Sequence, residues 1–107
     1  MPVTIYISGA ITHDPLYKRK FDEAERLLKA SFQYVSIINP ASNEVDTTDM
    51  DAEQIWQAFM EISREQVKRS DIMATLDGWE QSSGAVEEVA LAKSNGILVC
   101  SVKELIK

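Results

Sequence analysis

The residues best suited to chemistry gather around position 80, in a stretch rich in hydroxyls, small side chains and acids. Ser82, Ser83 and Gly84 open a predicted helix there, and Glu87 and Glu88 stand in its first turns. The first backbone N–H groups of a helix have no partner inside the helix, so they point outward and attract anions. The stretch therefore predicts a binding site for an anionic group such as a phosphate, with two carboxylates close by.

The two glutamates differ in where the helix would place them. At about 100° per residue, the apolar side chains predict one broad buried face made of Ala85, Val86, Val89, Ala90 and Ala92. Glu87 then points into solvent, whereas Glu88 falls on the border of that face, about 110° from its centre. A carboxylate on this border can lie under the preceding loop. Alternatively, both glutamates are simply first-turn acids that the helix dipole favours.

The elements that must position these residues alternate between strands and helices. Apolar runs at 3–8, 34–38, 72–76 and 96–100 predict strands. Helices are predicted from Asp14 as N-cap and Pro15 as first residue to about residue 31, then over 52–70 and from Gly84 to Asn95, with a short one from Ser101.

This alternation favours an α/β fold with a parallel sheet and right-handed crossovers. The continuously apolar strands indicate a sheet covered on both faces. We therefore predict a flavodoxin-like or Rossmann-like three-layer sandwich of four to five strands, in the order 2-1-3-4(-5). In that order the switch point lies between strands one and three, where ligands bind in such folds. Tyr6 to Gly9 and the segment 77–88 would meet there.

One polar residue falls on an apolar stripe of the helix over 52–70. Ser63 shares its face with Trp56, Met60 and Val67. A small hydroxyl on a buried face either bonds back to its own helix or faces a polar cavity.

Composition narrows the class of protein. The 107 residues fit one domain, 1–107, with 45% hydrophobic and 26% charged residues. The net charge of −6 disfavours a nucleic-acid polymer as partner. No apolar run is long enough to span a membrane, and the N-terminus does not resemble a signal peptide. The single Cys100 fits a protein of the reducing cytoplasm.

The sequence lacks the motifs of several functions that are common in this fold class. The first strand ends without the acids of a phosphate-receiving regulator or the Cys and Arg of a small tyrosine phosphatase. The chain also has no Gly-rich loop with Lys for triphosphates and no dinucleotide fingerprint. His13, the one histidine, has no obvious partner and is interpreted as a loop residue.

Several short motifs, in their order and spacing, resemble the nucleoside 2-deoxyribosyltransferase-like superfamily, and within it the small DUF4406 branch. The matching segments are Tyr6-Ile7-Ser8-Gly9, Ile38-Asn39-Pro40-Ala41, Ser70-Asp71-Ile72, and Gly78-Trp79-Glu80-Gln81-Ser82-Ser83-Gly84-Ala85, with Glu88 and Ala92.

The resemblance implies a nucleophilic role for Glu88 and an orienting role for Tyr6. It implies that Gly9 lets a ligand approach the backbone, and that Ser82, with Ser83 and Gly84, holds a 5′-phosphate. No cofactor and no metal is implied. The superfamily commonly forms homodimers, so a homodimer is expected.

Other positions leave alternatives open. Trp79 either stacks on a base or covers the edge of the core, and Asp77 either contacts the base or forms a turn with Gly78. Asp71 is interpreted as a structural acid at the strand entrance. Ser63 replaces the aspartate that usually assists protonation of the base in the superfamily.

The expected function is therefore cleavage or transfer of an N-glycosidic bond in a 2′-deoxyribonucleoside or its 5′-monophosphate. The alternatives are a nucleotide-binding module without turnover and, third, cleavage of another N-glycoside such as a nicotinamide nucleotide.

Overall fold

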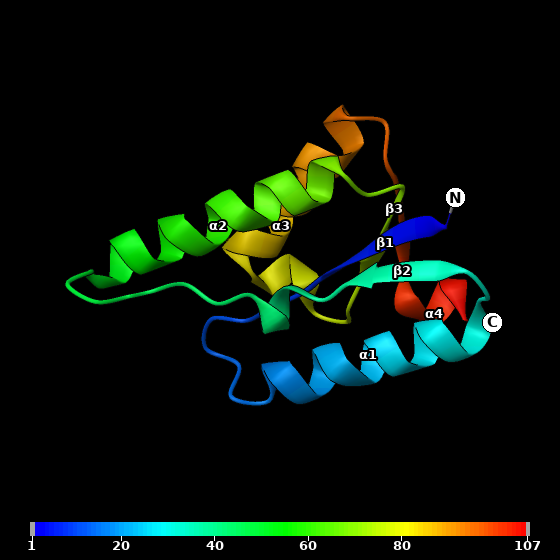
Figure 1. Cartoon of the computed structure of the whole chain (residues 1–107), viewed down its shortest axis with the longest axis horizontal. Helices are drawn as coiled ribbons and strands as arrows, with labels where there is room; N and C mark the ends of the chain where they lie inside the picture. Colours follow the sequence, from blue (N-terminus) through cyan, green and yellow to red (C-terminus); the bar gives the residue numbers. More distant parts are fainter. Residues whose placement is uncertain (1, 107) are drawn as a thin grey trace.

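The computed structural model describes residues 2–106 and is built on a four-stranded parallel sheet (Figure 1). Its strands are β1 (Val3–Ser8), β2 (Val35–Ile38), β3 (Ile72–Thr75) and β4 (Leu98–Ser101). The strand order is β2-β1-β3-β4, and every neighbouring pair is parallel. The predicted order and fold class are confirmed, with the sheet at the lower end of the predicted size.

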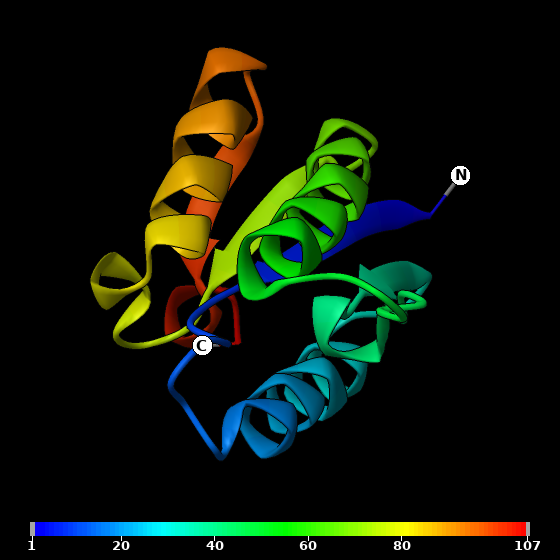
Figure 2. The ribbon, with the colours of Figure 1, turned by 90° about the vertical axis from the view of Figure 1, so that its left-hand side faces the viewer.

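Helices cover both faces of this sheet, as Figure 2 shows. They are α1 (Tyr17–Ser31), α2 (Ala52–Lys68), α3 (Ser83–Ser94) and the short α4 (Val102–Leu105), with 3-10 turns η1 (Pro40–Ser42) and η2 (Trp79–Gln81). One apolar cluster joins the sheet to α1 and α4, and a second joins it to α2 and α3. The result is a three-layer sandwich of the flavodoxin-like type.

The central strand β1 supplies side chains to both layers. Ile5 and Ile7 belong to the cluster under α1, whereas Tyr6 belongs to the cluster under α2 and α3. Side chains along a strand alternate between the two faces of the sheet, so Ser8 shares the face of Tyr6. All four side chains are buried, with 1% exposure or less.

The start of α1 differs from the prediction. The helix begins at Tyr17, and Asp14 does not cap it. Instead, the Asp14 carboxylate accepts a hydrogen bond from the backbone N–H of Leu16 at 2.9 Å and forms an ion pair with Lys20 at 2.8 Å. A short carboxylate that bonds two residues ahead stabilises a local turn. That turn delays the helix by two residues.

Two other helices begin with a capping box. Asp51 and Gln54 form a capping box at the start of α2, and Ser101 and Glu104 form one at the start of α4. The second was predicted from the sequence and is confirmed. Each box satisfies N–H groups that would otherwise lack a partner.

The interpretation of Asp71 as a structural acid is also confirmed. Its carboxylate accepts the backbone N–H of Thr4 at 2.8 Å, and its own N–H donates to the Thr4 carbonyl at 2.8 Å. These two bonds tie the entrance of β3 to the start of β1.

Candidate active site

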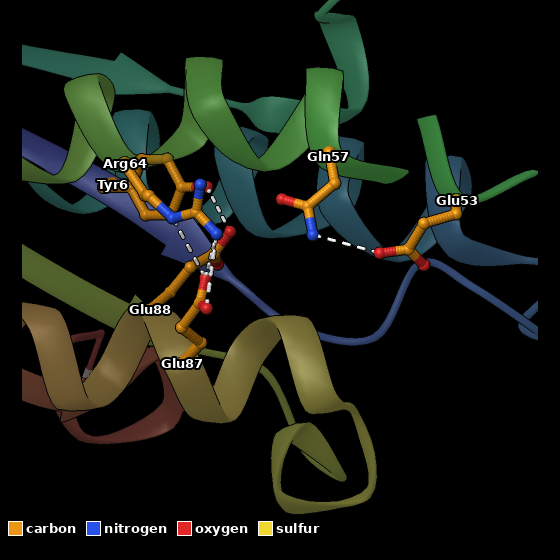
Figure 3. Close-up of polar contacts among 6 residues, drawn as sticks. All are labelled: Tyr6, Glu53, Gln57, Arg64, Glu87 and Glu88. Carbon is orange, nitrogen blue, oxygen red and sulfur yellow. Dashed lines mark hydrogen bonds and ion pairs between the residues drawn. The ribbon is translucent and has the colours of Figure 1, made fainter. Parts of the chain in front are cut away.

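The most distinctive polar cluster in the described chain lies where α3 packs on β1. The Tyr6 hydroxyl donates to Glu88 Oε2 at 3.0 Å, and the Ser8 hydroxyl donates to Glu88 Oε1 at 2.7 Å. Tyr6 and Ser8 are fully buried, and Glu88 is only 7% exposed. Figure 3 shows Glu88 pointing from α3 toward Tyr6. Each carboxylate oxygen thus has its own hydroxyl donor inside the protein.

Local periodicity explains this meeting. Tyr6 and Ser8 are two residues apart on one strand, so their hydroxyls point to the same side. On α3 the buried positions are Ala85, Glu88, Val89 and Ala92, a spacing of three, four and seven that defines one helix face. Glu88 therefore belongs to the buried stripe itself.

The predicted face of this helix was wrong at two positions. Val86 is 44% exposed and Ala90 is also exposed. Counting them as buried moved the calculated centre of the face away from Glu88 and left it on the border. An apolar residue on a helix surface is common and does not mark the core.

Ser63 of α2 completes the cluster. It is 6% exposed, and hydrogen bonding to its hydroxyl lowers the pKa of both Glu88 and Tyr6. Of the two interpretations left open by the sequence, the structure favours the one in which Ser63 faces a polar site. The Ser63 hydroxyl is therefore the third, after those of Tyr6 and Ser8, that stabilises the ionised Glu88 carboxylate.

Burial dominates the protonation of Glu88. Desolvation raises its pKa from 4.5 to about 7, although bonds from Ser8, Tyr6 and Ser63 act in the opposite direction. The neighbouring charge of Glu87 contributes a smaller part of this rise in pKa. Near neutral pH both the acid and the carboxylate are populated, so this side chain can exchange a proton or, once ionised, attack as a nucleophile.

Tyr6 stays protonated over the same range. Burial, followed by the charge of Glu88, raises its pKa well above 10.0. A phenol held neutral in this way remains a hydrogen-bond donor to the carboxylate.

The predicted phosphate-binding segment lies at the start of α3. Ser82 is the N-cap residue, and its hydroxyl accepts the Ala85 N–H at 3.2 Å. Ser83 is exposed, and Gly84 packs so that an added Cβ would lie 3.3 Å from the Met60 sulfur. The cap accounts for Ser82 structurally, and the Ser83 hydroxyl remains accessible at the helix start.

Gly9 has a packing role that the sequence did not reveal. A Cβ at this position would lie 2.8 Å from Leu76 Cδ1 and 2.9 Å from Leu76 Cβ. The close approach of Leu76, on the neighbouring strand end, already explains the glycine.

The two predicted base-binding residues lie in different environments. Trp79 is half-buried and packs against the apolar cluster that contains Tyr6. Asp77 is exposed and forms an ion pair of 2.7 Å with Lys103. Trp79 therefore covers the core edge beside the site, while Asp77 is bound to α4.

Ser8 is the residue that sequence reasoning missed as a member of the site. Its signal was available, because it lies two positions after Tyr6 on a predicted strand. The opposite partner, Glu88, could be matched to it only once the packing of α3 on β1 was known.

Comparison with known protein families identifies the family of this chain. A family model described as "Domain of unknown function (DUF4406)" matches residues 3–101, nearly the entire length. The chain belongs to this family. No curated protein and no solved structure matches it. Membership in DUF4406 is thus shown, and its description assigns no activity.

Two further features of residues 2–106 bear on the site. No helix in this range is long and apolar enough to cross a membrane. In the same range, His, Cys, Asp and Glu side chains form no group of three that could hold a metal ion.

Proposed function

We propose that this protein cleaves or transfers the N-glycosidic bond of a 2′-deoxyribonucleoside or its 5′-monophosphate, with Glu88 as nucleophile. The observation that carries the proposal is the buried Glu88 carboxylate bound by Tyr6 at 3.0 Å and Ser8 at 2.7 Å. The resemblance to the nucleoside 2-deoxyribosyltransferase-like superfamily supports the same roles for Glu88 and Tyr6.

In the first step, an oxygen of ionised Glu88 attacks the anomeric carbon of the sugar. A C–O bond forms as the C–N bond to the base breaks, and the base leaves with the electron pair of that bond and takes up a proton. A transition state of oxocarbenium character favours a carboxylate close to the sugar. Water, or a second base, then attacks the same carbon and releases Glu88.

The surrounding donors support this chemistry by orientation. Tyr6 and Ser8 fix both carboxylate oxygens, so the side chain cannot rotate away from the sugar. Preorganised groups of this kind lower the barrier because they need no rearrangement during the reaction. Ser83, with the start of α3, would hold a 5′-phosphate, and Trp79 would flank the base.

A nucleotide-binding module without turnover is the competing proposal. Two observations favour it. Ser63 occupies the position where the superfamily usually has an aspartate that assists protonation of the base, and a serine is a much weaker acid. Asp77, the other candidate acid, is engaged by Lys103.

Incubation with each of the four deoxynucleoside monophosphates, the deoxynucleosides and nicotinamide mononucleotide separates the two proposals. Free base is followed by chromatography, and binding by thermal shift. Base release that disappears in Glu88→Ala and falls in Tyr6→Phe supports the enzyme. Glu61→Ala, an exposed acid of α2, is the matched control and should retain activity. Binding without base release in the wild type would reject the enzymatic proposal.

We also propose that the protein acts in the reducing cytoplasm as a homodimer. The lone Cys100 supports the compartment, and the superfamily resemblance supports the dimer. Sedimentation analysis tests the oligomeric state directly.

A further inference from the structure

Two adjacent residues of α2 face two adjacent residues of α3. The inner pair is Ser63 and Glu88, which are both buried, and hydrogen bonding from Ser63 lowers the pKa of Glu88. The outer contact joins Arg64 to Glu87, with Arg64 Nε 3.2 Å from Oε2 and Nη2 3.3 Å from Oε1. Figure 3 shows the Arg64 side chain reaching from α2 toward Glu87 beside the Tyr6–Glu88 pair. The buried site thus has an ion pair at its rim.

This ion pair differs from the described ion pairs formed within one helix, which are Arg26–Glu23, Lys29–Glu25 and Lys68–Glu65. It links two helices that both contribute to the site, and its side chains are 35% and 44% exposed. The forked geometry commits the guanidinium to the Glu87 carboxylate. Arg64 directly follows Ser63 on α2, and Glu87 directly precedes Glu88 on α3, so Glu88 is the carboxylate next in sequence to the one that holds Arg64.

The groups that act on Glu88 come from three elements. Tyr6 and Ser8 donate from β1, Ser63 acts from α2, and Glu87 acts through its charge from α3, the helix of Glu88 itself. Arg64 balances the charge of Glu87. The Arg64 guanidinium is therefore paired with the exposed Glu87 carboxylate. The buried Glu88 carboxylate is bound by neutral hydroxyl donors.

We propose that Arg64 and Glu87 are positioning residues for Glu88: Glu87 holds the Arg64 guanidinium at the rim and keeps its positive charge off the buried carboxylate. The catalytic importance of this arrangement rests on the proposed function. A carboxylate that forms a buried ion pair with a guanidinium is a weaker nucleophile than one that accepts hydrogen bonds from hydroxyls, because the guanidinium neutralises its charge.

The proposal predicts opposite effects for the two partners. Glu87→Gln removes one negative charge and releases Arg64 toward Glu88, so the pKa of Glu88 should fall. Arg64→Gln leaves the charge of Glu87 unbalanced, so the pKa of Glu88 should rise. A unit charge added or removed at this range shifts a neighbouring pKa by roughly half a unit or more. A purely structural loosening would instead admit water and lower the pKa in both variants.

Carbon-13 NMR titration of the glutamate carboxyls tests this without any substrate. The Glu88 resonance is assigned by its loss in Glu88→Gln. The matched controls are Glu23→Gln and Arg26→Gln, which break an exposed ion pair on α1 and should leave Glu88 unchanged. The double variant of Arg64 and Glu87 should titrate between the two single variants.

Shifts of opposite sign in the two single variants support the proposal. Shifts of the same sign, or no shift in either, overturn it, whether or not base release is ever observed. If the protein releases base, the pH midpoint of that reaction should move in the same direction as the NMR midpoint in each variant. A midpoint that stays fixed while the NMR value moves would separate Glu88 from the reaction and reject the proposed function alone.

Discussion

Glu88→Gln should stabilise the folded protein at pH 8, even though it removes a buried, hydrogen-bonded side chain. The folded state raises the pKa of Glu88 from 4.5 to about 7, so it binds a proton more tightly than the unfolded chain does. Ionising Glu88 therefore costs more in the folded state. Glutamine has nearly the same shape and never ionises, so it escapes this cost.

The magnitude follows from the pKa difference. One pKa unit corresponds to about 1.4 kcal/mol, so a rise from 4.5 to about 7 is on the order of 3 kcal/mol. Because the folded pKa is the higher one, stability is greatest below about pH 4.5 and falls until the pH passes about 7. Between pH 5 and pH 8 the wild type should lose about 2.5 kcal/mol through this one group.

Urea denaturation of wild type and Glu88→Gln at pH 5, 6, 7 and 8 measures the effect. Carboxylates with a lowered pKa, such as Asp14 and Glu25, change stability only in more acidic solution, outside this window. The free energy of unfolding should fall with pH in the wild type and stay nearly level in the variant. The difference between the two curves is the quantity of interest, because effects common to both proteins cancel.

Parallel curves for the two proteins would refute the reasoning. They would mean that Glu88 has an ordinary pKa in the folded state and is not held in a dry environment. A wild type that gains stability between pH 5 and pH 8, relative to the variant, would refute it more strongly, because the donors would then outweigh burial.

Three further predictions concern residues around Glu88. Ser8→Ala should raise the pKa of Glu88 and cost about 1–3 kcal/mol at pH 8, because Oε1 loses its 2.7 Å donor; an unchanged titration by NMR would contradict this. Gly9→Ala should cost about 1–3 kcal/mol in urea denaturation, because the new methyl meets Leu76 at 2.8 Å; a neutral effect would mean that Leu76 moves freely. Ser63→Asp should increase base release by supplying an acid beside Glu88, and a decrease in the chromatographic assay would contradict that role.

Much of the fold was predictable because it depends on patterns that are local in sequence. The apolar runs located all the strands of the sheet, and their alternation with helices predicted that the sheet is parallel. Element ends were less accurate, as at Asp14, where a side-chain bond to Leu16 favours a turn over the expected cap. The same Asp side chain can form either bond, so the sequence alone does not decide between them.

The site was predictable only in part. Tyr6 and Glu88 were both expected, and the structure brings them together at 3.0 Å. Ser8 was overlooked, and exposed Val86 displaced the calculated face of α3. Which apolar residues of a helix are buried depends on the angle at which it packs on the sheet, and that angle is set by contacts distant in sequence.

The pH dependence of base release from a deoxynucleoside monophosphate tests the central claim most directly. In the free enzyme, kcat/KM reports the ionisation of the groups that the reaction needs. If ionised Glu88 is the nucleophile, kcat/KM should rise with pH through about 7 and then level off, and Glu88→Gln should release no base at any pH. Absence of release by the wild type across the whole range, or a rate that falls as pH rises through 7, would contradict the account.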